Sequence, residues 1–171
     1  MFDPKTKEYK FVDTCFSTHH LQFAYNNSDN LLWTSGGGPV VGWLNTKMFL
    51  ETGDEERSQG WTALILDTNG NGRRDEYVEP NQPVDPTKDK RFGGAFYAVA
   101  PAPDGSVWGS SLGFPGSVIR LTPGANPPAT ALAEAKPMPR TRASIVLVRA
   151  TASPLVSRAS SSARASTAAS R

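Results

Sequence analysis

The chain contains one cysteine in 171 residues and has no apolar run as long as a membrane-spanning helix. A single thiol cannot form an internal disulfide, so a small disulfide-stapled scaffold is excluded, and Cys15 is expected to be a buried, inert side chain. A bilayer-spanning helix needs ~20 apolar residues, and runs such as residues 143–148 are far shorter. The first residues also lack the basic start and apolar stretch of a signal peptide. The sequence therefore indicates neither a membrane span nor a secretion signal.

The last 33 residues lack most of the residue types that build a folded domain. From Pro139 onward there is no Trp, Phe, Tyr, Gly, Asp or Glu, and six arginines give this segment a charge of +6. The other 12 basic residues and all 16 acidic residues lie in residues 1–138. A low-complexity segment without aromatic residues cannot bury enough surface to offset its ordering entropy. We therefore predict that residues 135–171 form a disordered, low-complexity basic tail.

Three origins of this tail remain open from its composition. An Ala/Ser/Arg mixture is typical of a GC-rich gene read out of frame, so a frameshift is one explanation. A native disordered tail is the second. A basic arm that binds nucleic acid is the third, and it is disfavoured because the tail lacks every aromatic residue. We expect no nucleic-acid partner.

The rest of the chain combines short apolar runs with many turn-forming residues. Glycine (15) and proline (14) are frequent, and Gly, Pro, Asn and Asp separate the apolar runs. These runs lie at residues 31–34, 40–44, 61–66, 95–99, 106–109 and 118–121. Short strands separated by such turn-forming residues are typical of antiparallel sheets, so we predict an all-β fold. Only residues 47–56 are expected to form a helical turn or two.

Two segments share a tight turn followed by a strand that contains tryptophan. Asp-Asn-Leu-Leu-Trp at residues 29–33 matches Asp-Gly-Ser-Val-Trp at residues 104–108. A second strand ending in a polar turn follows each tryptophan by about ten residues, and it contains Leu44 in the first case and Leu121 in the second. Phe2 begins a similar strand end. The three apolar residues Phe2, Leu44 and Leu121 therefore mark a candidate repeat.

The intervals between these residues favour a β-propeller. Phe2 and Leu44 are 42 residues apart, which is the size of one four-stranded blade. Leu44 and Leu121 are 77 residues apart, which equals one blade plus an insertion of about 35 residues. We assign this insertion to the polar segment at about residues 53–90. An unrelated β-meander or β-sandwich is the alternative.

The second repeat and the segment after it resemble a known family. Asp-Gly-Ser-Val-Trp at residues 104–108, followed by Val-Ile-Arg-Leu-Thr-Pro-Gly at residues 118–124, resembles a blade of the streptogramin (virginiamycin B) lyase-like and NHL-type β-propellers. The resemblance implies that residues 1–134 form a partial β-propeller of about two four-stranded blades plus the edges of two more. Because two blades cannot close a ring, it also implies a truncated fragment of a longer protein.

The two histidines, His19 and His20, are the candidate catalytic residues that the resemblance suggests. His20 precedes a strand, as in the Pro-His element that opens the family's blades, with Thr-His here in place of Pro-His. The family's lyases linearise a cyclic depsipeptide by elimination, with a histidine base and a magnesium ion near the central channel. The His-x-Glu-x-His-type signature of those enzymes is absent. A histidine at a strand start beside the channel is the simpler interpretation, so the catalytic residues stay unassigned.

Residues 67–75 match the calcium-binding loop of EF-hand type. Side-chain oxygens fall at positions 1, 3, 5 and 9, a glycine falls at position 6, and a backbone carbonyl falls at position 7. The candidate ligands are Asp67, Asn69, Asn71, the carbonyl of Arg73, and Asp75. Position 12 holds Val78 instead of glutamate, so weak binding of Ca²⁺ near ~10⁻⁴ M is expected. A polar hairpin loop without metal is the alternative.

Two functions follow from these observations. The first is a fragment of a non-catalytic propeller that binds an unknown ligand and contains a calcium loop. The second is a fragment of a streptogramin-lyase-like C–O lyase whose catalytic residues lie in missing blades. The partner in either case is expected to be the missing blades or a second copy of the chain. A weak calcium site favours a periplasmic or secreted parent protein, because calcium is millimolar there.

Overall fold

The computed structural model describes residues 1–25, 30–36, 38–113 and 116–137, with the side chains of residues 136 and 137 excepted. All of these residues belong to one compact unit, Met1–Arg140. The predicted tail beyond residue 137 lies outside the described residues. Among the described residues, no helix is long and apolar enough to cross a membrane.

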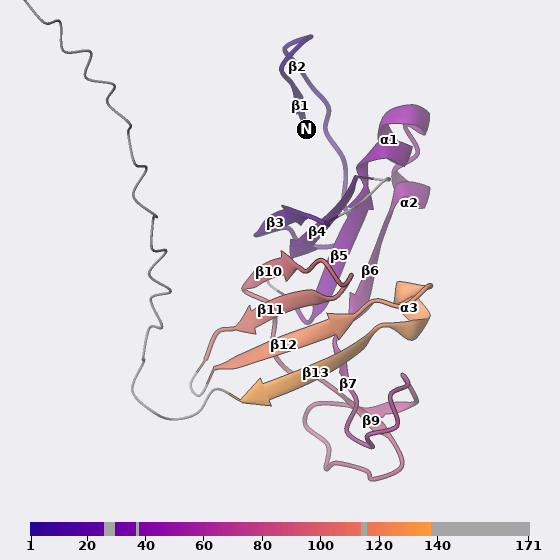
Figure 1. Cartoon of the computed structure of the whole chain (residues 1–171), viewed down its shortest axis with the longest axis vertical. Helices are drawn as coiled ribbons and strands as arrows, with labels where there is room; N and C mark the ends of the chain where they lie inside the picture. The colour runs from indigo at the N-terminus through magenta and orange to yellow at the C-terminus, as the bar shows by residue number, and fades with distance from the viewer. Residues whose placement is uncertain (26–29, 37, 114–115, 138–171) are drawn as a thin grey trace, which may run out of the picture. The chain divides into compact units, whose positions relative to one another are not determined.

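The first sheet is a four-stranded antiparallel meander. Its strands follow one another in space as they do in the chain (Figure 1): β3 (Leu21–Phe23), β4 (Leu31–Ser35), β5 (Val40–Asn45) and β6 (Gln59–Ala63). Two short helices, α1 (Thr46–Thr52) and α2 (Glu55–Ser58), connect β5 to β6 where the sequence predicts a helical turn or two. Asn45 caps α1 by accepting from the backbone N–H of Met48, and Gly53 ends it in the left-handed conformation.

The second sheet repeats this meander. It contains β10 (Ala98–Pro101), β11 (Val107–Ser111), β12 (Ser117–Thr122) and β13 (Leu132–Pro137), again with neighbouring strands antiparallel. A single helical turn, α3 (Pro127–Thr130), lies between β12 and β13. Strand β13 extends three residues into the segment that the sequence assigns to the tail.

An insert of residues 64–97 separates the two meanders and extends the second sheet. It contains β7 (Ile65–Leu66), β8 (Tyr77–Val78) and β9 (Asp89–Arg91), and β7 pairs with β13 in parallel through Leu66 and Ala133. The insert expected from the sequence, at about residues 53–90, therefore begins too early, because residues 59–63 form β6 and complete the first sheet. Trp61 and Thr62 are residues that favour a strand.

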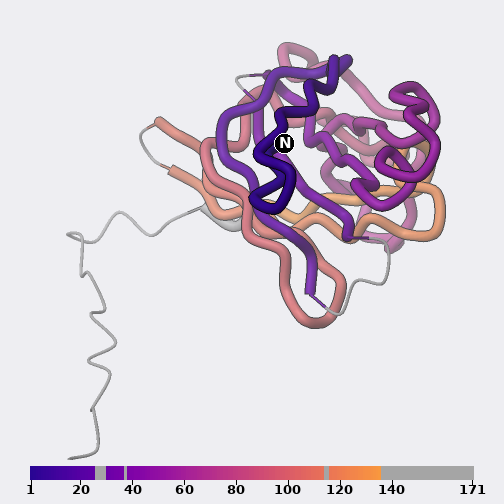
Figure 2. The backbone as a smooth tube through the Cα atoms, turned by 90° about the horizontal axis from the view of Figure 1, so that it is seen from above, coloured from indigo at the N-terminus to yellow at the C-terminus, as the bar shows by residue number. Residues whose placement is uncertain are grey.

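The amino-terminal segment forms a small hairpin next to the first sheet. The hairpin strands are β1 (Phe2–Asp3) and β2 (Glu8–Tyr9), drawn in indigo in Figure 2. A groove of about 750 Å³ lies between the hairpin and the first sheet. Its apolar lining is Met1, Phe2, Leu21, Phe23, Leu32 and Leu50. Cys15, predicted to be buried, is exposed, so that prediction is wrong.

The two meanders are alike in local structure as well as in strand order. Asn30 and Gly105, which the sequence repeat aligns, both have positive φ, at 50° and 84°, and both precede the second strand of their sheet. Leu44 and Leu121 are both buried on the third strand. These local matches make the two sheets copies of one structural pattern.

The main hydrophobic core lies where the two sheets meet. Strand β10 packs against β3 and β4, and α3 packs against β6. The fully buried members of this core include Val41 and Leu64 from the first half and Val107, Ile119 and Leu121 from the second sheet. The fold is mostly β-strand, so the all-β prediction is confirmed.

The two matching tryptophans differ in burial. Trp33 is only 3% exposed and lies in the core between the sheets, with its ring 5.6 Å from that of Trp43. Trp108 is 39% exposed, and its strand partner Arg120 lies over its ring. Trp108 is paired with Arg120, and Arg120 with Glu134, on neighbouring strands, so the three side chains lie on the same face of the second sheet. We call this surface the outer face of the second sheet.

Candidate functional sites

Both predicted histidines lie in a small polar cluster at the start of β3 and β10, the first strands of the two meanders. His20 directly precedes β3, and Tyr97 directly precedes β10. The three rings of His19, His20 and Tyr97 are in mutual contact, with centroids 4.4 to 5.1 Å apart. We call His19, His20, Ser35 and Tyr97 the strand-start cluster.

Hydrogen bonds to one carbonyl organise this cluster. The Tyr97 carbonyl lies 2.7 Å from His20 Nδ1 and 3.3 Å from His19 Nδ1, and it accepts from Ser35 Oγ at 2.9 Å. Because a carbonyl can only accept, His20 donates its Nδ1–H, and its neutral ring keeps the lone pair on Nε2. An imidazole oriented in this way can act as a base or as a metal ligand.

The backbone holds the cluster in place. The His19 N–H donates to the Ser35 carbonyl at 2.7 Å, and the Ser35 N–H donates to the His20 carbonyl at 2.9 Å. The Ser35 side chain accepts from the His20 N–H at 3.2 Å. Both histidines are exposed, so the cluster is accessible from solvent. Sequence reasoning missed Ser35 and Tyr97, which come close to the histidines only through the packing of β10 against β3 and β4.

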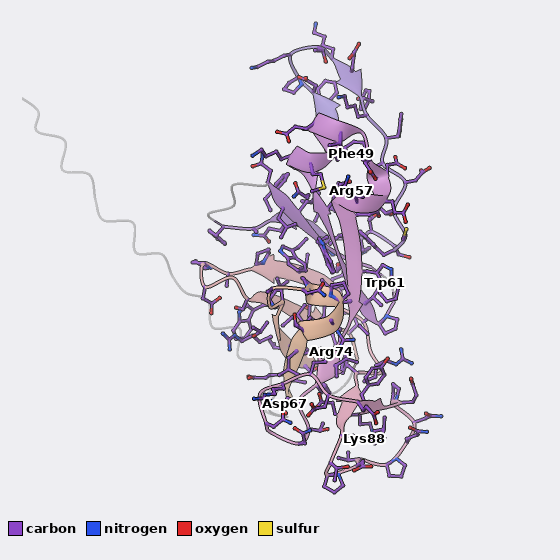
Figure 3. The ribbon with its side chains drawn as sticks, turned by 90° about the vertical axis from the view of Figure 1, so that its right-hand side faces the viewer. Phe49, Arg57, Trp61, Asp67, Arg74 and Lys88 are labelled. Carbon is purple, nitrogen blue, oxygen red and sulfur yellow. The ribbon has the colours of Figure 1, made fainter. Side chains whose placement is uncertain are left out.

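The second candidate site is the loop that follows β7. Asp67 accepts from the backbone N–H groups of Gly70 and Asn71 through Oδ1, at 2.7 and 3.1 Å, and from Gly72 through Oδ2 at 2.9 Å. Gly70 and Gly72 have φ near +75°, a conformation that favours glycine. Figure 3 labels Asp67 and Arg74 where the insert leaves the sheet. The sequence therefore folds into a tight loop that wraps around the carboxylate of its first residue.

Two asparagines connect the middle of this loop to its end. Asn69 and Asn71 each accept from the backbone two residues ahead, and both donate from their amide nitrogens to Asp75 Oδ2, at 2.9 and 2.5 Å. These amide hydrogen bonds, that of Asn69 first, hold the pKa of Asp75 below its ordinary value of 3.8. Asp75 is thus kept as a carboxylate, which is the form that binds calcium.

Asp89, on β9, contacts the end of the loop and was not predicted from the sequence. Its Oδ2 accepts from the backbone N–H of Asp75 at 2.8 Å, while its own N–H donates to the Glu76 carbonyl. The residue is fully buried, and Oδ1 has no hydrogen-bond partner among the described residues. Asp89 is 14 residues beyond Asp75 in sequence, so no local pattern could have linked the two.

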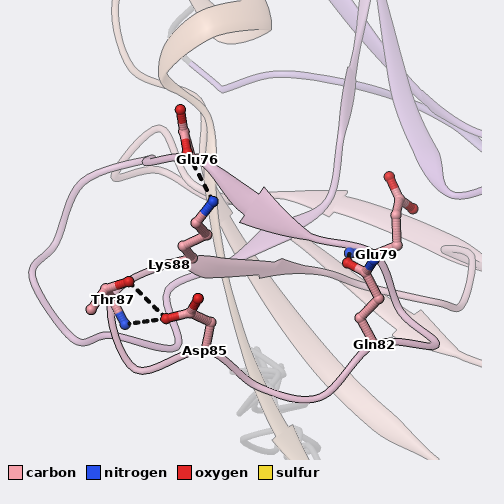
Figure 4. Close-up of polar contacts among 6 residues, drawn as sticks. All are labelled: Glu76, Glu79, Gln82, Asp85, Thr87 and Lys88. Atoms are coloured by element: carbon pink, nitrogen blue, oxygen red, sulfur yellow. Dashed lines mark hydrogen bonds and ion pairs between the residues drawn. The ribbon is translucent and has the colours of Figure 1, made fainter.

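Other contacts fix the rest of the insert. Lys88 forms an ion pair with Glu76 at 3.0 Å, and Asp85 accepts from both the backbone and the hydroxyl of Thr87 (Figure 4). Arg91 forms an ion pair with Glu79 at 2.6 Å. Exposed pairs of this kind contribute little stability individually. Together they connect the two ends of the segment 76–91, which contains Asp89.

The five sequence-predicted ligands are all described, and they are brought together only in part. Asp67, Asn69, Asn71 and Asp75 belong to one hydrogen-bonded loop that includes the backbone of Arg73. Within the described residues, no group of three or more His, Cys, Asp or Glu side chains is arranged to hold a metal ion. Any metal site here therefore needs the asparagine amides and a backbone carbonyl as well.

Comparison of the chain with family models, with curated proteins and with solved structures found no match.

Proposed function

We propose that this chain is part of a β-propeller-type binding scaffold, with the two meanders as consecutive blades and the insert as a calcium-binding loop. The repetition of one four-stranded meander is the observation that carries the proposal. Propeller blades are four-stranded antiparallel sheets of 40–45 residues that pack face to face. The meanders here span residues 21–63 and 98–137, which matches that size.

The exposure of the two tryptophans supports the same proposal. Trp33 is covered because the second sheet packs on its face, and Trp108 is exposed on the corresponding face of the second sheet. In a ring of blades each such face is covered by the next blade. A further sheet on the outer face would cover Trp108 as the second sheet covers Trp33. The proposed scaffold is similar in this respect to the streptogramin lyase-like and NHL-type propellers.

The strand-start cluster is where we propose that a ligand binds. His20 and Tyr97 each precede the innermost strand of their sheet, and in propellers these strands line the central channel. Two accessible imidazoles and a phenol ring offer stacking and hydrogen bonding to a polar, ring-containing ligand. Fold does not decide the ligand, because propellers host many functions.

Solution behaviour tests the scaffold proposal. Two sheets cannot close a ring, and the full chain exposes both the outer face and the groove beside the first sheet. We expect concentration-dependent association, measured by light scattering coupled to gel filtration. A stable monomer at all concentrations that unfolds in a single cooperative thermal transition would contradict the proposal.

A lyase is the second candidate, and the orientation of His20 favours it. The free Nε2 of His20 could accept the proton in an elimination that opens a lactone to an alkene and a carboxylate. The product has the mass of the substrate, because no water is added. Incubation of the chain with a streptogramin B depsipeptide and Mg²⁺, followed by chromatography, separates the two candidates. Ring opening that is lost in His20→Gln would support the lyase, and an unchanged substrate would show that His20 does not catalyse the elimination in this chain.

A further inference from the structure

The unpartnered oxygen of Asp89 requires a chemical explanation. The side chain is fully buried, Oδ2 is bound to the backbone of Asp75, and Oδ1 has no partner among the described residues. Leaving a buried carboxylate oxygen unpaired is costly, and such groups are normally satisfied by hydrogen bonds, charges or metal ions. Because Oδ2 contacts the ninth residue of the loop, Oδ1 of the same carboxylate is also held beside the loop.

Counting the ligands shows what the loop lacks. Calcium takes six to eight oxygens. The loop offers five oxygen-bearing groups, and its twelfth position, which should supply a carboxylate, holds Val78 in β8. Strand β8 pairs in parallel with β9, and this pairing sets Tyr77 opposite Asp89 and Val78 opposite Lys90. The pairing thus places Asp89 beside β8 at the residue before Val78, and the hydrogen bond from the Asp75 N–H connects its carboxylate to the end of the loop.

We propose that Asp89 takes the role of the missing twelfth ligand, so that Ca²⁺ is bound by the loop and by β9 together. This inference rests on the calcium loop of the proposed function. With the ion bound, Asp89 raises the number of carboxylates from two to three and the number of oxygens to six or seven. The described residues do not present these three carboxylates around one point, so the proposed set forms only when the ion binds. Calcium affinity increases with the charge of the ligand set, so binding is tighter than the loop alone would allow.

Binding requires only local rearrangement. The amides of Asn69 and Asn71 now donate to Asp75 Oδ2. Each amide oxygen accepts one backbone N–H and keeps a second lone pair for the cation. Loss of the two amide hydrogen bonds frees Asp75 Oδ2, and the cation then replaces the amide hydrogens as its partner. Asp89 does not need to move to reach the loop, because its hydrogen bond to the Asp75 backbone already fixes it there.

Arg74 is the competing explanation for Asp89. Its Nη1 donates to Thr62 Oγ1 at 2.8 Å. Burial lowers the pKa of Arg74, and the charges of Tyr77 and Asp89 oppose this shift. If Asp89 served only to compensate Arg74, its removal would destabilise the protein equally with and without calcium. A calcium ligand gives a different result, since its removal acts only when calcium is present.

Calorimetric titration of the full chain with CaCl₂ tests the proposal, with Asp89→Asn as the variant and Asp85→Asn as the matched control. Asp85 lies in the same insert, but it is only half-buried and its carboxylate is bound to Thr87. We expect Asp89→Asn to weaken the Kd by at least about tenfold and Asp85→Asn to leave it unchanged. Equal Kd values for the wild type and Asp89→Asn would overturn the proposal and leave the loop intact. No binding by the wild type would overturn the loop as well.

A measurement on the wild type removes any dependence on how the variant folds. The carboxyl carbons of selectively labelled aspartates are followed by NMR during calcium titration. We expect the Asp89 and Asp67 signals to shift with one common Kd while the Asp85 signal stays in place. An Asp89 signal that does not move at saturating calcium would overturn the proposal. Thermal unfolding in chelator adds a check: Asp89→Asn should be as stable as the wild type or more so, because it removes a buried unpaired charge.

Discussion

The ring of Phe96 lies directly over the Cα of Gly109, so that a methyl group at position 109 would collide with it. Phe96 is 1% exposed, and Gly109 is the middle residue of β11. The first sheet contains a similar pair, in which Phe16 lies over Gly42 of β5. In each sheet a phenylalanine that precedes the first strand, β3 or β10, covers a glycine of a longer strand. The absence of a side chain at these glycines makes room for the phenylalanine ring.

Gly109→Ala is expected to destabilise the protein by about 1–3 kcal/mol, because the buried Phe96 ring has no free space into which to move. Chemical denaturation with urea measures the loss. Gly38→Ala is the control, since no atom among the described residues lies within 4 Å of a methyl group added there. Equal stability of the two variants would show that the Phe96 ring is not held against β11.

Trp108→Glu is expected to reduce self-association of the chain. A charge placed in the outer face opposes the burial of that face against another sheet. Tyr77→Glu is the matched control, because Tyr77 is 41% exposed compared with 39% for Trp108, but lies in the insert. Light scattering across a concentration series measures the association. If both variants associate like the wild type, the outer face is not the contact surface.

Asp67→Ala is expected to abolish calcium binding, whereas Asp75→Ala should only weaken it. Asp67 occupies the first position and its carboxylate also organises three backbone N–H groups. Asp75 occupies the ninth position, which often binds calcium through a water molecule. Titration calorimetry compares the two variants. A larger loss for Asp75→Ala would contradict the assignment of positions in the loop.

Acid is expected to loosen the Asp104 turn only below pH 3.8. The hydroxyl and the backbone N–H of Ser106 hold the pKa of Asp104 below its ordinary value of 3.8, and Arg120 acts in the same direction. A carboxyl group with a depressed pKa stabilises the fold above its unfolded pKa, and this contribution disappears as the pH falls through the folded value. NMR titration of the Asp104 carboxyl carbon measures this directly. A midpoint at or above 3.8 would contradict the hydrogen bonding described for this turn.

The neutral imidazole of His20 is expected to carry its proton on Nδ1, because the Tyr97 carbonyl accepts that proton at 2.7 Å. Nitrogen-15 chemical shifts of the ring distinguish the two tautomers. His19, at 3.3 Å from the same carbonyl, should show a more mixed population. Predominant protonation of His20 at Nε2 would remove the oriented lone pair on which the lyase alternative depends.

The sequence predicted the strands better than it predicted their surroundings. The strands that begin at Leu31 and Val107 follow from the turn-forming residues before them, and both form as expected. The different burial of Trp33 and Trp108 could not be predicted, because it depends on which sheet face has a neighbour. Asp89 reaches the loop only through the pairing of β8 with β9, which carries no signal in the residues themselves.

The pairing of β7 with β13 affects whether a strand of another chain can add to the edge of β13. Asp67 donates its backbone N–H to the Ala133 carbonyl, so the polar groups of β13 at this point are occupied from within the molecule. An uncovered outer strand is a template on which a foreign strand can add and fibrils can grow. The insert therefore covers this edge of β13, so that a foreign strand cannot add to the backbone of β13 at Ala133.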